Sequence, residues 1–198
     1  MSGISWTVTV VCGASGVGKS SVAIPLAARY GVPLAEADDI VTALKAITTP
    51  RDQPVLHYWD THPEARSWPA ERIADLHLSV CDVLLPGIRA VIADHIEFGA
   101  PVVLEGDYLV PELVADFGAA VRAVVLHEPD EHRIAANFGA REPGEHEFRA
   151  KVSVEIGTRL ATRAAAVGVP VVRPWPWSDG LDRVDTVFRS VERADRRG

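Results

Sequence analysis

Residues 6–20 read Trp-Thr-Val-Thr-Val-Val-Cys-Gly-Ala-Ser-Gly-Val-Gly-Lys-Ser, and this stretch decides the fold. The β-branched run from Thr7 to Val11 is typical of a buried strand, and a helix-compatible run from Ser21 to Tyr30 follows the stretch. Between them, residues 13–20 match the pattern G-x-x-x-x-G-K-[ST] at every fixed position. Because the required strand and helix flank the match, a chance occurrence is disfavoured. The stretch predicts a phosphate-binding loop.

The residue types in this loop suit the phosphates of a nucleoside triphosphate. Its glycines allow backbone conformations closed to other residues, so successive amides can point at phosphate oxygens, and the next helix directs its positive end there. Lys19 adds a positive charge, and the Ser20 hydroxyl can bind Mg²⁺. The chain has no Asn-Lys-x-Asp motif for reading guanine. We therefore expect ATP and Mg²⁺ as cofactors, with the nucleotide held by Gly13, Ala14, Ser15, Gly16, Val17, Gly18, Lys19, Ser20 and Ser21.

Composition indicates one globular domain over residues 1–198, with 47% hydrophobic and 24% charged residues. The net charge of −7 disfavours a nucleic-acid partner. No targeting segment or membrane-length apolar run is evident, so we expect no membrane partner. Cys12 and Cys81 lie in apolar contexts without a metal-ligand spacing, which fits a reducing cytoplasm. The sequence leaves monomer and homodimer open.

Alternating strand and helix patterns predict an α/β fold with a parallel sheet and helices on both faces. Pro86 should kink or split its helix. We expect a single P-loop kinase domain, with an acceptor-side loop at about 48–69 and a short lid at about 133–149. The five expected strands are 7–11, 32–36, 101–105, 121–126 and 169–172, and the expected helices are 21–30, 40–45, 70–98, 112–117, 128–138, 147–166 and 181–193.

Acidic residues follow the second and third predicted strands, where ligands gather in parallel sheets. Asp38 is the first candidate for a base that accepts a hydroxyl proton, with Asp39 as a metal ligand; a helix N-cap is the alternative. Glu105 is expected to support Mg²⁺ together with Ser20. Glu105 and Asp107 are both expected to face the acceptor. An ordinary strand-to-loop turn explains Glu105 and Asp107 equally well.

The acceptor-side loop carries the aromatic stretch from His57 to His62. Histidines there can contact an anionic acceptor, and an indole can wall it off. We expect His57, Trp59 and His62 to bind the acceptor, and packing among the aromatic rings is the competing interpretation.

Arginines flank the loop between the two helices of the predicted lid. Arg133 and Arg141 are expected to lie over the transferring phosphoryl group, whereas Arg149 fits a solvated helix face. After the last strand, Pro174 and Trp175 are expected near the nucleotide base, where flat rings can stack. Core or surface packing is an equal alternative for them.

Several motifs in order resemble the 2-phosphoglycerate kinase-like family over roughly residues 7–185. Only the phosphate loop is highly specific by itself, and the other motifs support the resemblance through their order and spacing. They are the loop at 13–20, Asp38, Val91-Ile92, Leu104-Glu105-Gly106, Leu109-Val110-Pro111, Glu131-His132-Arg133 and Gly168-Val169-Pro170-Val171.

The resemblance implies ATP- and Mg²⁺-dependent phosphorylation of a small hydroxylated acceptor, in the archetype 2-phosphoglycerate. Basic residues are expected to bind such an anion, and the aromatic, partly acidic stretch at 57–60 departs from that expectation. The chloramphenicol phosphotransferase-like kinases, similar in length and in the Asp after the second strand, supply a neutral natural product as the alternative acceptor. A regulatory nucleotide-binding protein with slow hydrolysis is the alternative from another class. The expected catalytic residues are Lys19, Asp38, Arg133 and Arg141.

Overall fold

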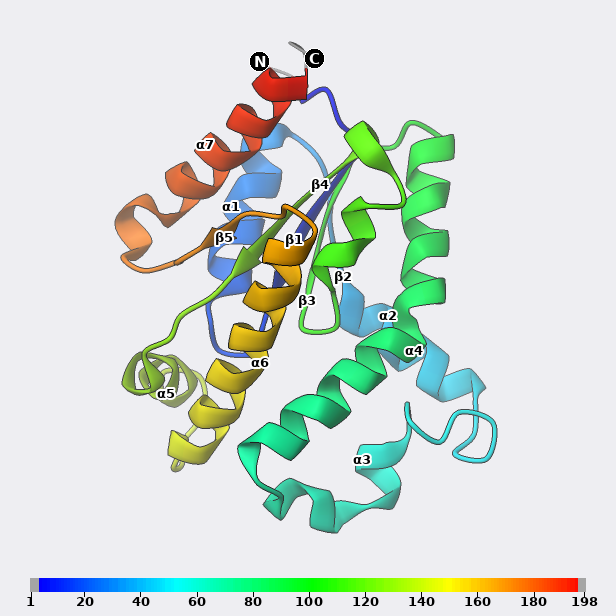
Figure 1. Cartoon of the computed structure of the whole chain (residues 1–198), viewed down its shortest axis with the longest axis vertical. Coiled ribbons are helices and arrows are strands. Elements are labelled where there is room, and N and C mark those ends of the chain that lie inside the picture. Colours follow the sequence, from blue (N-terminus) through cyan, green and yellow to red (C-terminus); the bar gives the residue numbers. More distant parts are fainter. Residues whose placement is uncertain (1–3, 196–198) are drawn as a thin grey trace.

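The computed structural model describes residues 4–195 and contains a five-stranded parallel sheet (Figure 1). The strands run in the order β2-β3-β1-β4-β5, so the chain crosses over between non-adjacent strands. Every residue of β1, β3 and β4 is buried, as expected for strands covered on both faces. The predicted five-stranded parallel sheet is confirmed. The strand bounds are β1 Val8–Gly13, β2 Leu34–Glu36, β3 Val102–Gly106, β4 Val121–Leu126 and β5 Val171–Val172.

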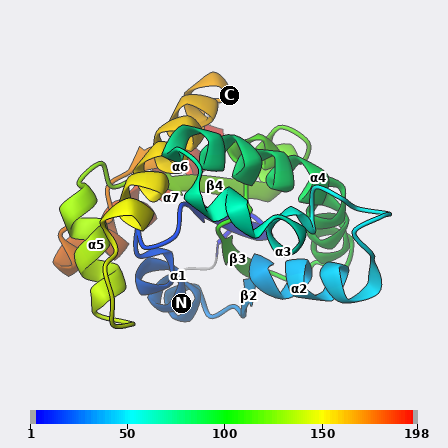
Figure 2. The same cartoon turned by 90° about the horizontal axis from the view of Figure 1, so that it is seen from below.

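Helices cover both faces of this sheet (Figure 2). Helices α4 and α6 pack together on one face, and α1 lies on the other with α7 against it. The helix bounds are α1 Lys19–Tyr30, α2 Ala37–Ile47, α3 Tyr58–Thr61, α4 Ala70–Glu97, α5 Glu131–Gly139, α6 Glu147–Ala166 and α7 Trp177–Asp195, with 3₁₀ turns η1 Pro63–Ser67, η2 Pro111–Val114 and η3 Gly118–Ala120.

Helix α4 continues through Pro86 and bends near its middle, so the proline kinks the helix without splitting it (Figure 1). Among residues 4–195 it is also the one helix long and apolar enough to cross a membrane by length and composition. One face of α4 is nevertheless buried against the sheet and α6, with Ile73, Val80, Leu84, Ile88 and Ile92 in the core. It is a core helix of this fold.

Two boundaries differ from the sequence predictions in ways that affect the site. Helix α2 begins at Ala37, so Asp38 and Asp39 lie in its first turn rather than before it. Carboxylates are favoured there because the exposed amides of a helix N-terminus carry partial positive charge. Helix α7 begins at Trp177, four residues earlier than predicted, which fixes the indole beside the phosphate loop.

Candidate active site

The phosphate loop leaves β1 at Gly13 and enters α1 at Lys19. Gly16 and Gly18 have φ angles of +76° and +91°, which residues with a Cβ rarely adopt. A Cβ at Gly18 would clash with the ring of Trp177. The loop therefore needs glycine both for its backbone path and for its close contact with α7.

The Lys19 ammonium is held at the centre of the site. The side chain is 7% exposed, and its Nζ donates to the Ala14 carbonyl oxygen at 3.1 Å and forms an ion pair with Asp107. The partner lies directly after β3, which pairs with β1 in the sheet. The charge that is expected to meet a phosphate is thus paired with a carboxylate.

The Ser20 hydroxyl donates a 2.9 Å hydrogen bond to Oε1 of Glu105. Glu105 is 4% exposed, and its second oxygen, Oε2, is buried without a hydrogen-bond partner. The register of β1 and β3, which pairs Val11 with Glu105, brings this carboxylate beside the loop. A hydroxyl and a buried carboxylate oxygen without a partner fit Mg²⁺, which prefers one or two such ligands and completes its shell with water and phosphates. Consistently, residues 4–195 contain no group of three His, Cys, Asp or Glu side chains that could cage a metal by themselves.

A polar cavity of about 130 Å³ joins these groups. It brings together the phosphate loop, the start of α2, the end of β3 and the loop between α5 and α6, where a lid is predicted. The lining contains four carboxylates and two cationic side chains. The lining residues are Ser15, Gly16, Gly18, Lys19, Ser20, Glu36, Asp38, Glu105, Gly106, Asp107 and Arg141. Two larger cavities, of about 570 and 390 Å³, contain none of the predicted site residues, so volume does not mark the site in this molecule.

Asp38 stands at the rim of this cavity on the first turn of α2. The helix N-cap is Glu36, and its side chain makes no capping hydrogen bond, so the N-cap interpretation of Asp38 does not hold. Partial burial raises the pKa of Asp38, and the negative charge of Asp107 adds to that shift. Asp39 does not line the cavity; its role as a metal ligand stays a prediction without a contact to support it.

The aromatic residues of the acceptor-side loop are engaged with one another. His57 is buried, with Nε2 2.9 Å from Oγ1 of Thr48, and His62 stacks on Tyr58 with the ring centroids 3.9 Å apart. Neither histidine, nor Trp59, lines the cavity. The contacts found are those of packing within the loop, and the expected acceptor contacts of His57, Trp59 and His62 remain untested.

The lid arginines have separate surroundings. Arg141 lines the cavity, whereas Arg133 pairs with Glu128 and lies over the ring of Trp175, 4.9 Å from its centroid. Arg149 pairs with Glu142 and covers the Phe138 ring, which agrees with the expected surface role. Pro174 and Trp175 stand in the loop between β5 and α7, on the Arg133 side of the phosphate loop.

His77 belongs to the site although no sequence pattern indicated it. Its Nε2 lies 2.9 Å from the backbone carbonyl oxygen of Asp107, and its ring stacks on Tyr108 at 5.1 Å. Burial lowers the pKa of His77, and because a carbonyl oxygen can only accept, Nε2 is the donor in this contact. The contact joins α4 to the end of β3 across 30 residues, which a local pattern cannot reveal.

Comparisons with known proteins found kinases that are similar to this chain in sequence and in structure. No protein-family profile matches it. The chain is 29% identical to the 2-phosphoglycerate kinase of Methanococcus maripaludis strain C6 over 119 residues, which are 55% of this chain and 38% of that protein. It is 27% identical to the 2-phosphoglycerate kinase of Methanococcus vannielii over 131 residues, 60% of this chain and 41% of that one. The matched part thus spans about two fifths of these relatives.

Solved structures share the fold at lower sequence identity. A shikimate kinase from Bacteroides thetaiotaomicron superposes with a TM-score of 0.57 at 12% identity, covering 92% of this chain and 98% of that one. A gluconokinase from Sinorhizobium meliloti 1021 gives a TM-score of 0.51 at 18% identity, covering 93% and 97%. The chain is thus distantly similar in sequence to 2-phosphoglycerate kinases and shares the fold of a shikimate kinase and a gluconokinase.

Proposed function

We propose that the protein is a kinase that transfers the γ-phosphoryl group of ATP to a hydroxyl group of a small molecule in the cytoplasm. One observation carries the proposal: a single polar cavity joins the phosphate loop, the Ser20–Glu105 pair and the carboxylate of Asp38. A nucleotide-binding site alone does not require an acid at the start of α2. Phosphoryl transfer to a hydroxyl needs a group that orients the hydroxyl and accepts its proton, and a carboxylate in this position can do both.

The loop amides and Lys19 would hold the phosphates, with the lysine exchanging Asp107 for phosphate oxygens. Ser20 and Glu105 would hold Mg²⁺, which supplies neutralisation of the charge on the phosphates when bound. Arg141, already at the cavity, would contact the transferring group once the lid loop closes.

Asp38 would orient the acceptor hydroxyl and take its proton. Its raised pKa, caused chiefly by partial burial, makes the carboxylate a stronger base than an ordinary aspartate. Positioning and proton acceptance then come from one residue.

The names of the relatives put 2-phosphoglycerate first among the acceptors to be assayed. A second class is favoured by the charge of the cavity: Glu36, Asp38 and Asp107 face it, and its two cations, Lys19 and Arg141, are assigned to ATP. Carboxylates repel an acceptor that carries both a carboxylate and a phosphate, and they accept hydrogen bonds from neutral hydroxyls. A neutral polyhydroxylated natural product is therefore the second candidate.

The test is ATP consumption by the purified protein with a panel of acceptors that includes 2-phosphoglycerate and neutral hydroxylated natural products. Mass detection of an added phosphoryl group identifies the product. We expect one class to accelerate ATP consumption. ATP binding with slow hydrolysis that no acceptor accelerates would instead support the regulatory nucleotide-binding alternative.

A further inference from the structure

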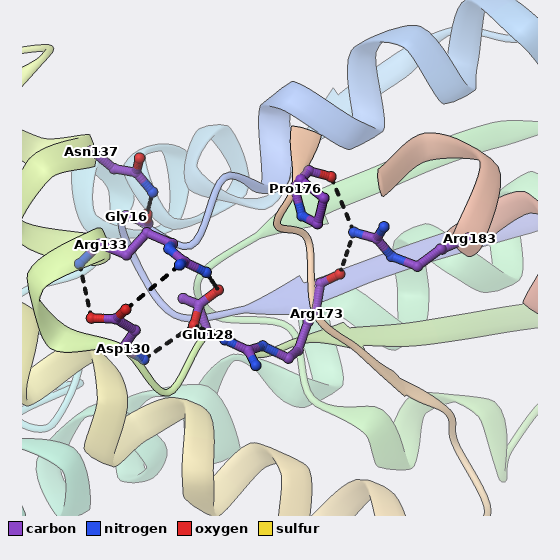
Figure 3. A network of polar contacts seen from close by, with 8 residues as sticks. All are labelled: Gly16, Glu128, Asp130, Arg133, Asn137, Arg173, Pro176 and Arg183. Atoms are coloured by element: carbon purple, nitrogen blue, oxygen red, sulfur yellow. Dashed lines mark hydrogen bonds and ion pairs between the residues drawn. The ribbon is translucent and has the colours of Figure 1, made fainter. Parts of the chain in front are cut away.

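Glu128 is a buried carboxylate that the proposed transfer does not use. It follows β4 and is 1% exposed. Its Oε1 accepts hydrogen bonds from Nη2 of Arg173 at 2.7 Å and from the backbone N of Asp130 at 3.1 Å. Its Oε2 accepts from Nη1 of Arg133 at 3.4 Å (Figure 3). One carboxylate thus binds two arginines.

The two arginines come from elements that are far apart in the sequence. Arg133 lies in α5 at the start of the lid, and Arg173 directly follows β5. Both reach solvent in part, so neither needs this carboxylate to balance a buried charge. Two guanidinium groups gathered at one point repel each other unless an anion lies between them. Glu128 therefore holds Arg133 beside Arg173, and Oδ2 of Asp130, 3.7 Å from Nη2 of Arg133, adds a second and more exposed contact.

Arg133 is held against an aromatic wall that touches the phosphate loop. Its guanidinium lies over Trp175, and the Trp175 ring meets Trp177 edge to face with the centroids 5.7 Å apart. Trp177 in turn packs on Gly18. The flat surfaces of Arg133 and Trp175 therefore lie one side chain away from the loop that binds phosphates.

Both sides of this wall are fixed before a nucleotide binds. Asn137 of α5 donates from Nδ2 to the Gly16 carbonyl oxygen at 2.9 Å (Figure 3). On the other side, Nη2 of Arg183 donates to the carbonyl oxygens of Arg173 at 2.9 Å and Pro176 at 3.2 Å. Helix α5 and the loop after β5 are thus anchored, and the Glu128 carboxylate joins them.

We propose that Glu128 is a positioning residue for the nucleotide base, which keeps Arg133 beside Trp175 so that guanidinium and indole offer flat surfaces to the purine. Without this carboxylate, Arg133 keeps only its longer contact with Asp130, at 3.7 Å, and its guanidinium is held less firmly beside Trp175. The assignment rests on the proposed function only in requiring a nucleotide at the phosphate loop. It reassigns Arg133 from the transferring phosphoryl group to the base.

The test compares the binding of ATP and of inorganic triphosphate to the wild type and to Glu128→Gln, by calorimetry with Mg²⁺. The glutamine keeps the shape of the side chain and removes the charge that gathers the arginines. We expect the Kd for ATP to rise about tenfold or more, because one stacking contact to a base is typically worth that much. The Kd for inorganic triphosphate, which has no base, should stay within about twofold.

Glu112→Gln is the matched control. Glu112 also pairs with an arginine, its Oε1 lying 2.5 Å from Nε of Arg163, and neither residue lines the cavity at the phosphate loop. This variant should bind both ligands as the wild type does. Arg133→Ala should show the same selective loss of ATP affinity, and adding Glu128→Gln to it should change little, because the carboxylate acts through that arginine.

Three outcomes overturn the assignment. If Glu128→Gln weakens the binding of ATP and of inorganic triphosphate equally, Arg133 contacts the phosphates. If the variant binds ATP as the wild type does, Glu128 only supports the fold. A wild type that binds neither ligand refutes the proposed function as well. Selective loss of ATP affinity in a protein that phosphorylates no acceptor refutes the kinase and supports the base assignment. Thermal unfolding of each variant distinguishes these results from loss of the fold.

Discussion

The Ser20 hydroxyl lies 2.9 Å from Oε1 of Glu105, and Oε2 of the same buried carboxylate has no hydrogen-bond partner. A carboxylate removed from water normally has all of its oxygens satisfied. An oxygen without a partner, beside the serine of a phosphate loop, is therefore ready for a cation. This pair connects the motif read from the sequence to a residue 85 positions later.

Replacing Glu105 with Gln should raise the Mg²⁺ concentration needed for half-maximal turnover. The amide keeps an acceptor for Ser20 but loses the negative charge, so we expect a rise of about tenfold to a hundredfold, as for other residues that support a bound metal. The measurement is initial rate against Mg²⁺ concentration at saturating ATP. Recovery of most of the turnover at high Mg²⁺ is expected. An unchanged Mg²⁺ requirement would assign the metal to other groups.

Lys19→Ala should lower turnover by about two to three orders of magnitude while the fold is kept, because the ammonium stabilises charge on the transferring group. The variant leaves Asp107 without its partner. Steady-state kinetics and circular dichroism check the two halves of this expectation. Turnover close to that of the wild type would remove the phosphate-loop assignment.

Asp38→Asn should lower kcat by roughly 10²–10⁴-fold and leave ATP binding nearly unchanged, since Lys19 and Ser20 remain. In the wild type, activity should fall on the acid side at a pH above the ordinary aspartate pKa of about 3.9, because the raised pKa of Asp38 keeps its proton bound up to a higher pH. The pH–rate profile of the residual activity in Asp38→Asn should lack that acid limb. Wild-type phosphotransfer by this variant would end the base hypothesis and direct attention to Asp39 or Glu105.

Asp38→Asn should lose activity, but its thermal stability should be unchanged or higher. The pKa of Asp38 is higher in the folded state, so the folded protein binds the extra proton and loses relative stability as pH rises through that pKa. Above that pKa the ionised carboxylate is therefore a destabilising group, and there Asp38→Asn should unfold at the same temperature as the wild type or a higher one. Thermal unfolding at pH 7 and at a pH below 4 tests this, because the difference between the two proteins should shrink at the acid pH.

Arg141→Ala should lower kcat more than it weakens ATP binding, because Arg141 reaches the cavity from the loop between α5 and α6, which can close over the site. Arg149→Ala is the control from the neighbouring helix α6, since Arg149 pairs with Glu142 and, unlike Arg141, does not line the cavity. Its kcat should stay within about twofold of the wild type. Weaker ATP binding in Arg141→Ala with kcat unchanged would make Arg141 a static nucleotide contact.

The sequence by itself determined the phosphate loop, the parallel sheet and the helices on both of its faces. Each of these follows from local information: the glycine spacing before Lys19, and apolar runs whose period and length distinguish strands from helices. The acidic residues after β2 and β3 were also predictable, because they follow directly from where a strand ends. The element boundaries were less predictable, because α2 and α7 begin earlier in the structure than the sequence indicated.

Only the tertiary structure decided which charged groups meet. The order β2-β3-β1-β4-β5 places the end of β3 beside the phosphate loop, and this brings Asp107 to Lys19 from 88 residues away. The same long-range packing sets His77 on the Asp107 carbonyl and Glu128 between Arg133 and Arg173. A hydrogen bond needs two groups within about 3 Å in the right orientation, and for residues this far apart in the chain only the folded arrangement of strands and helices supplies that distance.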